Sequence, residues 1–289
     1  MTVWTLQGME PAHFIAWAAL LGLLAGSFIN VVAYRLPIML KRQWRRTAQE
    51  VLKLPLSTSA RFDLWLPGSH CPLCKHVIRA WQNIPVLSYL ALNGRCRGCK
   101  GQISMRYPLV EVACTVLSVA IAWRFGPSEQ ALYALLLTWC LLTLSLIDAD
   151  HQLLPDVLVL PAVWLGLIVN AGDGFAPLGD ALWGAVLGYL SLWAVYWTFK
   201  LLTGKEGLGY GDFKLMALIG AWGGWQALPL TLLLSSVAGA FIGLCLIALR
   251  RHAMGAAMPF GPYLAIAGWI AVLWDDEISP SYMQLLGSQ

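Results

Sequence analysis

The sequence predicts an all-α polytopic membrane protein with about eight transmembrane helices and a small cytoplasmic zinc-binding loop that carries four cysteine ligands. Composition is the first indication, because 58% of the 289 residues are hydrophobic and only 12% are charged. Repeated apolar stretches near the roughly 20 residues that cross a bilayer are the second. The third is a basic segment, residues 37–106, that contains two pairs of closely spaced cysteines.

Apolar windows along the chain predict where these helices lie. The predicted spans are 13–34, 107–125, 130–147, 157–170, 180–202, 213–225, 229–249 and 259–274. Two of them, 157–170 and 213–225, are short for the hydrocarbon core, and both begin just after an acidic motif. Residues 1–12 contain no Lys or Arg and the first apolar run is too long for a signal peptide, so we expect a retained helix.

The distribution of charge predicts the orientation of the helices. Residues 37–106 hold twelve of the nineteen Lys and Arg residues, and loops of this kind stay cytoplasmic, which places both termini outside. The other loops agree: the basic residues Lys200, Lys205, Lys214, Arg250 and Arg251 fall on the predicted inner side, and the acidic residues Asp173, Asp180, Asp275, Asp276 and Glu277 fall on the outer side. We expect a first helix in 1–36, a cytoplasmic loop in 37–106 and a seven-helix membrane domain in 107–289.

The net charge of +4 is explained by the membrane and does not require a nucleic acid partner. The basic residues concentrate where anionic headgroups lie, and each contributes about 1 kcal/mol near such a surface. Residues 41–54, "KRQWRRTAQEVLKL", mix basic and apolar positions. This segment predicts either a helix on the inner leaflet or a solvated loop helix.

Four of the seven cysteines predict a metal site within the basic loop. Cys71 and Cys74 form one CxxC pair, Cys96 and Cys99 form another, and twenty-one residues separate the pairs. Two such knuckles fit one tetrahedral thiolate site, and a reducing cytoplasm disfavours disulfides. The alternative, incidental or redox-active cysteines, fits this spacing less well. Because four protein ligands leave no open position, we expect a structural zinc ion.

Two acidic motifs adjoin predicted spans. The motif "LSLIDADHQLLPD" places Asp148 and Asp150 at the inner end of the third span and Asp156 at the start of the fourth. The motif "GYGDFKL" places Asp212 at the inner start of the sixth. An ionisable group in or beside a span is costly unless it is paired or hydrated, which makes each a functional candidate.

Two of these four acids have an ordinary structural explanation that requires no catalytic role. Asp156 follows a proline and precedes an apolar run, which is typical of a helix N-cap, and Asp150 is expected to be an exposed turn residue. Asp148 and Asp212 remain as a pair at one depth. Two carboxyl groups that share a site cannot both ionise easily, so one can act as an acid while the other activates water. The chain contains no Walker loop, HExxH or GxSxG motif, which leaves an aspartyl mechanism as the simplest prediction.

The whole pattern resembles the prepilin peptidases, also called type IV leader peptidases, of type IV pilus and type II secretion systems. The resemblance covers nearly the full length. It rests on "GSFINVVAYRLP", the paired CxxC loop, "RYPLVE", "SLIDADHQLLPD", "GYGDFKL" and "PFGPYLAIAG", in this order. GxGD alone is weak, because presenilin-like proteases share it, but the six motifs together are highly specific.

The resemblance implies an inner-membrane aspartyl protease that removes the short basic leader of prepilins and pseudopilins on the cytoplasmic side, after a glycine. At the matching positions, the catalytic pair is Asp148 and Asp212. Family members with the cysteine loop are bifunctional, which implies methylation of the new N-terminal amine with S-adenosylmethionine. The motifs do not locate the site of this cofactor, and Glu111 is the one residue we name as a candidate for it.

Three polar residues near the ends of the first two spans have open roles. Arg35 is expected to anchor the first span on its basic side, and Gly26 and Ser27 to serve close helix packing. Asn30 is a packing residue or a polar contact to the substrate. Glu111 lies inside the second span, where a lone acid is usually functional or paired, so it is a candidate for binding a cation or the substrate amine.

Two other classes of protein explain part of this sequence. A small transporter would place acids near the midplane and repeat its halves, but the acids here cluster at the inner interface and no repeat is visible. A zinc-bearing membrane scaffold without chemistry leaves the paired acids unexplained. Both alternatives therefore account for less of the sequence than a peptidase does.

Overall fold

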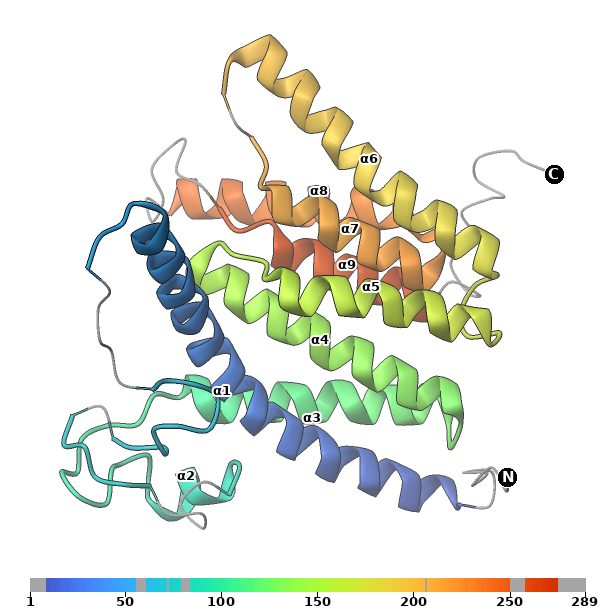
Figure 1. Cartoon of the computed structure of the whole chain (residues 1–289). Helices are drawn as coiled ribbons and strands as arrows, with labels where there is room; N and C mark the ends of the chain where they lie inside the picture. Colours follow the sequence, from blue (N-terminus) through green and yellow to red (C-terminus); the bar gives the residue numbers. More distant parts are fainter. Residues whose placement is uncertain are drawn as a thin grey trace. The chain divides into compact units, whose positions relative to one another are not determined.

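The computed structural model describes residues 9–55, 61–71, 73–78, 84–205, 207–249 and 258–274. These residues form helices and two isolated β-bridges but no strand, so the prediction of an all-α fold is confirmed. The helices are α1 (Pro11–Val51), α2 (Leu87–Ala91), α3 (Arg106–Phe125), α4 (Glu129–His151), α5 (Asp156–Ala171), α6 (Leu178–Thr203), α7 (Tyr210–Gly223), α8 (Ala227–Ala248) and α9 (Gly261–Leu273) (Figure 1). Contacts divide the chain into two units, Met1–Leu135 and Leu136–Gln289.

In the first unit, α1 packs along α3. Gly22 and Gly26 of α1 lie so close to Ser118 and Glu111 of α3 that a Cβ atom at either glycine would overlap its neighbour. Small residues of this kind let helix backbones approach each other in a membrane. The predicted packing role of Gly26 is therefore confirmed.

Helix α1 continues far beyond the predicted end of the first span. It extends for 41 residues, and at about 1.5 Å of rise per residue it is about 60 Å long, roughly twice the hydrocarbon thickness. Residues 37–51, which the sequence placed in the loop, are helical, so most of the basic segment 41–54 continues α1. Pro37 does not end the helix, because its turn is buried against the rest of the unit and good helix formers follow it.

Arg35 is buried and does not act as a simple anchor in the headgroup region. Its guanidinium group donates to the carbonyl oxygens of Asp63 at 3.0 Å and of Pro67 at 2.7 Å. It also lies 5.7 Å from the ring of Phe62. Arg35 therefore fixes residues 62–67 against the end of the apolar part of α1, since charge-assisted bonds of this kind are among the stronger ones.

The second unit is built around the short helix α7. Eleven residues of α7 are buried, and α5, α6 and α9 pack against it (Figure 1). A helix that is apolar all round belongs in the interior of a bundle, where protein surrounds it on every side. With 14 residues, α7 is about 21 Å long and does not need to match the bilayer.

All eight predicted spans coincide with helices, but their lengths differ. Five helices, α1, α3, α4, α6 and α8, are long and apolar enough to cross a membrane, and α5 and α9 are shorter apolar helices. The count of about eight spans therefore stays a prediction. Arg250, Arg251, Asp275, Asp276 and Glu277, which carry part of the predicted charge asymmetry, lie outside the described residues.

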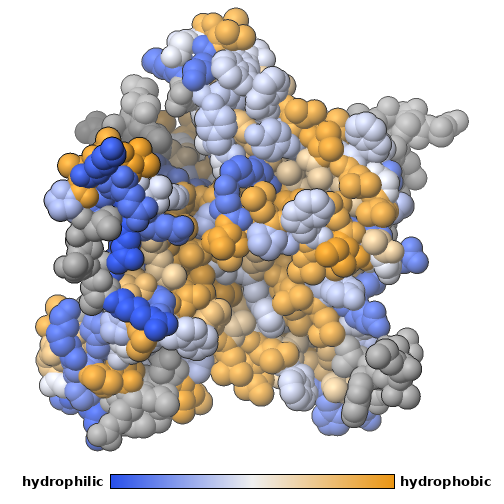
Figure 2. Space-filling view, viewed as in Figure 1, coloured by the Kyte–Doolittle hydropathy of each residue, from blue (hydrophilic) through white to orange (hydrophobic). Residues whose placement is uncertain are grey.

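The outward faces of the second unit are apolar. Trp164 and Ile168 of α5 and Leu182 and Trp183 of α6 are all well exposed. Figure 2 shows apolar side chains over much of the face that these two helices present. Exposed apolar faces of this extent are expected where lipid is the solvent.

A close backbone contact between two helices of this unit predicts a destabilising substitution. Gly184 of α6 and Gly220 of α7 face each other, and a Cβ atom at Gly184 would overlap the carbonyl oxygen of Gly220. We expect Gly184→Ala to lower the free energy of unfolding by about 1–3 kcal/mol, because two backbones must move apart. Thermal unfolding of the purified protein in detergent measures this change.

Gly179 is the matched control, since it also lies in α6 and no atom lies within 4 Å of the position of its Cβ. Alanine is the better helix former at both positions, so propensity alone cannot produce a loss. Equal melting temperatures for Gly184→Ala and Gly179→Ala would contradict the proposed contact.

Candidate active site

Asp148 lies in the last turn of α4, with its side chain turned inward. The residue is only 5% exposed. Its Oδ2 atom accepts a hydrogen bond of 2.9 Å from the backbone N–H of Gly261, the first residue of α9. A buried carboxyl group thus meets the N-terminal end of a helix, where backbone N–H groups and the helix dipole favour negative charge.

Asp212 lies in the first turn of α7 and is 7% exposed. Its Oδ2 atom accepts a hydrogen bond of 3.1 Å from the backbone N–H of Gly209, which precedes the helix. Gly209 has extended backbone angles, so the chain enters α7 abruptly and its N–H points back at the carboxyl group. The motif "GYGD" therefore places an acid at a helix start and supplies its donor.

The two candidate acids come together in the folded unit. Although 64 positions separate them in sequence, the carboxyl groups of Asp148 and Asp212 lie close enough for a direct Coulombic interaction. Two such groups in a buried site repel when both are charged, so protonation of one of them lowers their energy. This arrangement can exchange protons with a bound water molecule and with a leaving group.

Asp156 has a different partner from the one its sequence predicts. It is the first residue of α5, makes no capping hydrogen bond, and follows Pro155, which occupies the N-cap position. Its carboxylate instead accepts two hydrogen bonds, of 2.6 and 2.8 Å, from Nζ of Lys214 in α7. The N-cap prediction is wrong, because a lysine distant in sequence lies within reach.

The connection between α4 and α5 contacts the start of α7 at a second point. Leu154 packs against Gly211, and a Cβ atom at Gly211 would lie 2.9 Å from the Cβ atom of Leu154. Asp150, by contrast, is exposed, and it lies in the last turn of α4 and not in a turn outside the helix. The motifs "LLPD" and "GYGDFKL" therefore meet beside the acidic pair.

An aromatic cluster surrounds the other side of this helix start. The rings of Tyr196, Tyr210 and Phe213 lie 5.2 to 5.7 Å apart, and Tyr189 contacts Phe213 edge-on. Lys200 donates to the Tyr196 hydroxyl group at 3.0 Å. Pairs of this kind add roughly 0.5–1.5 kcal/mol each beyond the area that they bury, so they hold α6 on the first turn of α7.

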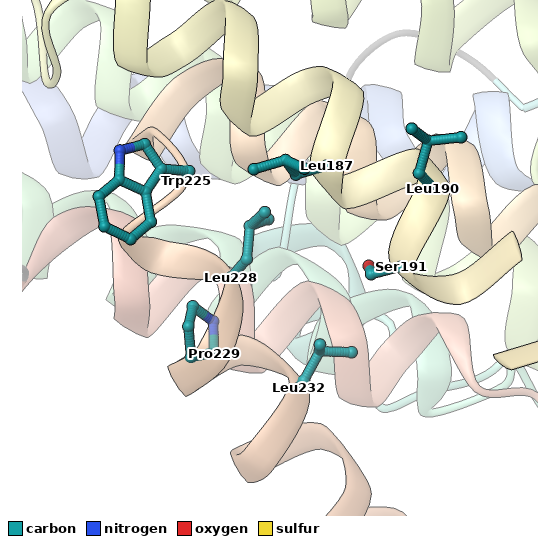
Figure 3. Close-up of a pocket in the computed structure, with 7 residues that line it drawn as sticks. All are labelled: Leu187, Leu190, Ser191, Trp225, Leu228, Pro229 and Leu232. Atoms are coloured by element: carbon teal, nitrogen blue, oxygen red, sulfur yellow. The ribbon is translucent and has the colours of Figure 1, made fainter. Parts of the chain in front are cut away.

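An open apolar groove of about 510 Å³ lies between α6 and α8 (Figure 3). It is lined by Leu187, Leu190 and Ser191 from α6, by Trp225 from the turn before α8, and by Leu228, Pro229 and Leu232 from α8. None of these side chains is ionisable. The groove therefore supplies no acid or base, and the candidate chemistry stays with the two aspartates.

In the first unit, the two cysteine pairs form a matched pair of turns. Lys75 and Lys100, which follow the pairs, both have positive φ angles. Each donates its backbone N–H at 2.9 Å to the carbonyl oxygen of the first cysteine of its own pair, Cys71 or Cys96. The same local sequence thus gives the same turn twice.

These turns bring four thiol groups together. The Sγ atoms of Cys71, Cys74, Cys96 and Cys99 all lie within 4.8 Å of one another, so the four residues could hold a metal ion. Backbone N–H groups of Cys74 and Leu73 lower the pKa of the Cys71 thiol to about 6. Donors of this kind favour the thiolate form, which is the form that binds metals.

Glu111 and Asn30 both make internal contacts in the first unit. The Oε2 atom of Glu111 accepts a hydrogen bond of 2.7 Å from the backbone N–H of Val86, and its carboxyl group also contacts the Ser27 side chain. Asn30 donates to the carbonyl oxygen of Tyr107 at 3.1 Å. Glu111 therefore fastens the segment before α2 to α3, and the contact of Asn30 agrees with a packing role.

Two residues of this site were not singled out by sequence reasoning. Gly261 and Lys214 both lie inside quoted motifs, "PFGPYLAIAG" and "GYGDFKL", yet neither was named as part of the site. The only sequence signal for these two residues was their place within the motifs. The contacts themselves depend on helices that are distant in sequence.

Comparison with known proteins gives two family matches that together span most of the chain. The type IV leader peptidase family matches residues 135–244, and the bacterial peptidase A24 N-terminal domain matches residues 20–125. No solved structure matches.

Several relatives named prepilin leader peptidase/N-methyltransferase are similar along their whole length. The protein from Pseudomonas putida is 68% identical, over 99% of this chain and 100% of its own. The protein from Stutzerimonas stutzeri is 61% identical, over 95% and 96% of the two chains. The protein from Neisseria gonorrhoeae is 50% identical, over 90% and 91%.

Proposed function

Because the chain belongs to the type IV leader peptidase family, we propose that it cleaves the leader peptide from prepilins and then N-methylates the new N-terminal residue. We assign the cleavage to Asp148 and Asp212. The observation that carries this assignment is that both carboxyl groups are buried, lie within Coulombic range of each other and are each held by one backbone N–H. Neither a small transporter nor a zinc-bearing scaffold requires such a pair.

The pair can hydrolyse a peptide bond without a covalent intermediate. One ionised carboxylate accepts a proton from a water molecule as its oxygen attacks the scissile carbonyl carbon. The protonated carboxyl group donates its proton toward the carbonyl oxygen, and a tetrahedral intermediate forms. When the C–N bond breaks, the pair donates its proton to the leaving amine and takes a proton back from a hydroxyl group of the intermediate, whose C=O bond re-forms. The pair therefore ends singly protonated, as it began.

The proposed setting is the inner membrane of a bacterium, with both termini periplasmic and the acids at the cytoplasmic face. The apolar helices support membrane insertion, and the basic character of residues 37–106 supports the orientation. The substrates are prepilins, and pseudopilins of type II secretion are proposed beside those of type IV pili. A prepilin helix in the bilayer with its basic leader inside would present the scissile bond at this face.

We propose zinc as the metal bound by the four cysteines. Thiolate–zinc bonds of about 2.3 Å in a tetrahedron place sulfur atoms about 3.8 Å apart. The Sγ atoms of Cys71 and Cys99, and those of Cys74 and Cys96, are each 3.9 Å apart. The four residues therefore fit a closed structural site, whose metal would cross-link the two turns.

The proposed methyl donor is S-adenosylmethionine, which supplies an electrophilic methyl group when bound. The chain must hold the neutral N-terminal amine of the cleaved pilin toward it. We place this activity with the cysteine loop and Glu111, because Glu111 joins α3 to the segment before α2 through the Val86 N–H. This contact supports a positioning role for Glu111 in methyl transfer.

Loss of either acid should abolish cleavage. Asparagine keeps the shape of aspartate and removes the proton transfer, which typically contributes about 10²–10⁴-fold. We expect Asp148→Asn and Asp212→Asn to lower leader cleavage by at least this range, and Asp156→Asn to retain it. Purified protein in detergent is incubated with a prepilin, and the loss of a leader-sized mass is followed. Near-normal cleavage by either of the first two variants, correctly inserted, would refute the aspartyl assignment.

Purified protein should contain one zinc ion per chain. Structural zinc in small cysteine domains has an apparent binding energy on the order of 10–16 kcal/mol, so the loop should depend on it. Elemental analysis of protein prepared without chelators measures the content. We expect the double variant Cys71→Ser, Cys99→Ser to lose zinc and the control Cys245→Ser, which alters an exposed cysteine of α8, to keep it. Full zinc content in the double variant would exclude this site.

Substitution of Glu111 should separate the two activities. Glu111→Gln replaces a charge-assisted hydrogen bond to Val86 by a neutral one, which is about half as strong. We expect lower methyl transfer to pre-cleaved pilin, measured with labelled cofactor, and unchanged leader cleavage. Glu129→Gln, at an exposed position of α4, is the control. Normal methyl transfer by Glu111→Gln would remove Glu111 from the proposal.

A further inference from the structure

The first turn of α9 directs the backbone N–H group of Gly261 at Asp148. The N–H groups at the start of a helix have no partner within it. In α9, Pro262 has no N–H, and the N–H groups of Tyr263 and Leu264 both bond to the carbonyl oxygen of Phe260. The remaining donor, the N–H of Gly261, bonds to Asp148.

The carboxyl group of Asp148 also needs the space that a side chain at position 261 would fill. A Cβ atom at this position would lie 2.7 Å from Oδ2 and 3.0 Å from Cγ of Asp148. The first distance is shorter than real Cβ contacts and the second is tighter than most of them, and the atoms that must move belong to the carboxyl group itself. The φ angle of Gly261 is not positive, so its backbone conformation alone would allow any residue.

Helix α9 is fixed to both helices that carry the acids. Trp269 of α9 donates from Nε1 to the hydroxyl group of Thr138 in α4 at 2.8 Å. Gly268 of α9 lies directly against Ile219 of α7. Gly261 therefore cannot move away from Asp148 without disturbing these contacts, and a new side chain at 261 would displace the carboxyl group instead.

We propose that Gly261 is a positioning residue for leader cleavage. Its N–H holds Oδ2 of Asp148, its missing side chain leaves room for the carboxyl group, and Oδ1 remains for water or the peptide. This inference rests on the proposed catalytic role of Asp148. The inference adds the "PFGP" segment to the peptidase site. The two acidic motifs alone do not give this segment a role in cleavage.

The test is Gly261→Ala, with kinetics of both activities. A misplacement of a catalytic group by about 1 Å can cost 10²-fold in rate. We expect kcat for leader cleavage to fall about 10²-fold with KM unchanged, because the substrate still binds and only the acid has moved. Methylation of pre-cleaved pilin should stay at the level of the unaltered protein. Alanine also favours a helix over glycine, so reduced stability of α9 is not expected.

Gly239→Ala is the matched control. Gly239 lies in α8 and faces Phe260 and Tyr263 of the same α9 turn, but its Cβ would meet them at 3.5 Å or more, an ordinary contact. Both activities of this variant should be normal. Equal loss of cleavage in the two variants would show that any change beside α9 is harmful and would overturn the proposal.

The remaining outcomes separate this inference from the proposed function. If Asp148→Asn abolishes cleavage and Gly261→Ala retains its normal kcat, Gly261 has no positioning role. If Gly261→Ala loses methylation together with cleavage, its effect is general and the proposal fails as well. If Asp148→Asn itself cleaves normally, the catalytic assignment is wrong and the role of Gly261 falls with it.

Discussion

The structure of the second unit depends on burying two carboxyl groups inside an apolar bundle. An acid in such surroundings costs several kcal/mol unless donors replace water. In this protein each acid receives a backbone N–H that a helix start leaves free: Gly209 serves Asp212, and Gly261 serves Asp148. A helix start must therefore lie at the depth of each acid. The short helices α7 and α9, of 14 and 13 residues, both begin beside the acids.

Short helices of this kind need protein on every side. Because α7 is too short to present a full apolar surface to lipid, α5, α6 and α9 enclose it. The enclosure depends on close backbone contact, as at Gly184 and Gly220, and on aromatic packing around Tyr196 and Phe213. The long helix α6 has exposed apolar residues on its outer face, so it separates α7 from the lipid. An acid at the start of α7 thus requires a short, enclosed helix. This enclosure in turn requires glycine in α6, where the backbones approach, and apolar residues along α7.

The sequence predicts those features that have a local or compositional signal. Apolar windows located the eight apolar helices, CxxC spacing located the four cysteines, and ionisable residues beside apolar runs located Asp148 and Asp212. Features that depend on distant partners were missed. The loop was expected to begin at residue 37, yet tertiary packing carries α1 on through Pro37. Asp156 had the local pattern of an N-cap, yet Lys214 binds it. The bond from Gly261 to Asp148 joins residues 113 positions apart, and no local pattern indicates a partner at that separation.

The two chemistries make different demands on the chain, and we propose that the two units meet them separately. Hydrolysis needs two acids whose protons are exchanged at fixed positions, and the second unit fixes them by backbone donors that cannot rotate away. Methyl transfer needs a polar cofactor and a neutral amine, and it needs no buried acid pair. The first unit is held by other means: a guanidinium group binding carbonyl oxygens at Arg35, a carboxylate binding an N–H at Glu111, and four thiols gathered for one metal ion. Because these bonds lie within Met1–Leu135 and the acids lie within Leu136–Gln289, a change in one set need not disturb the geometry of the other.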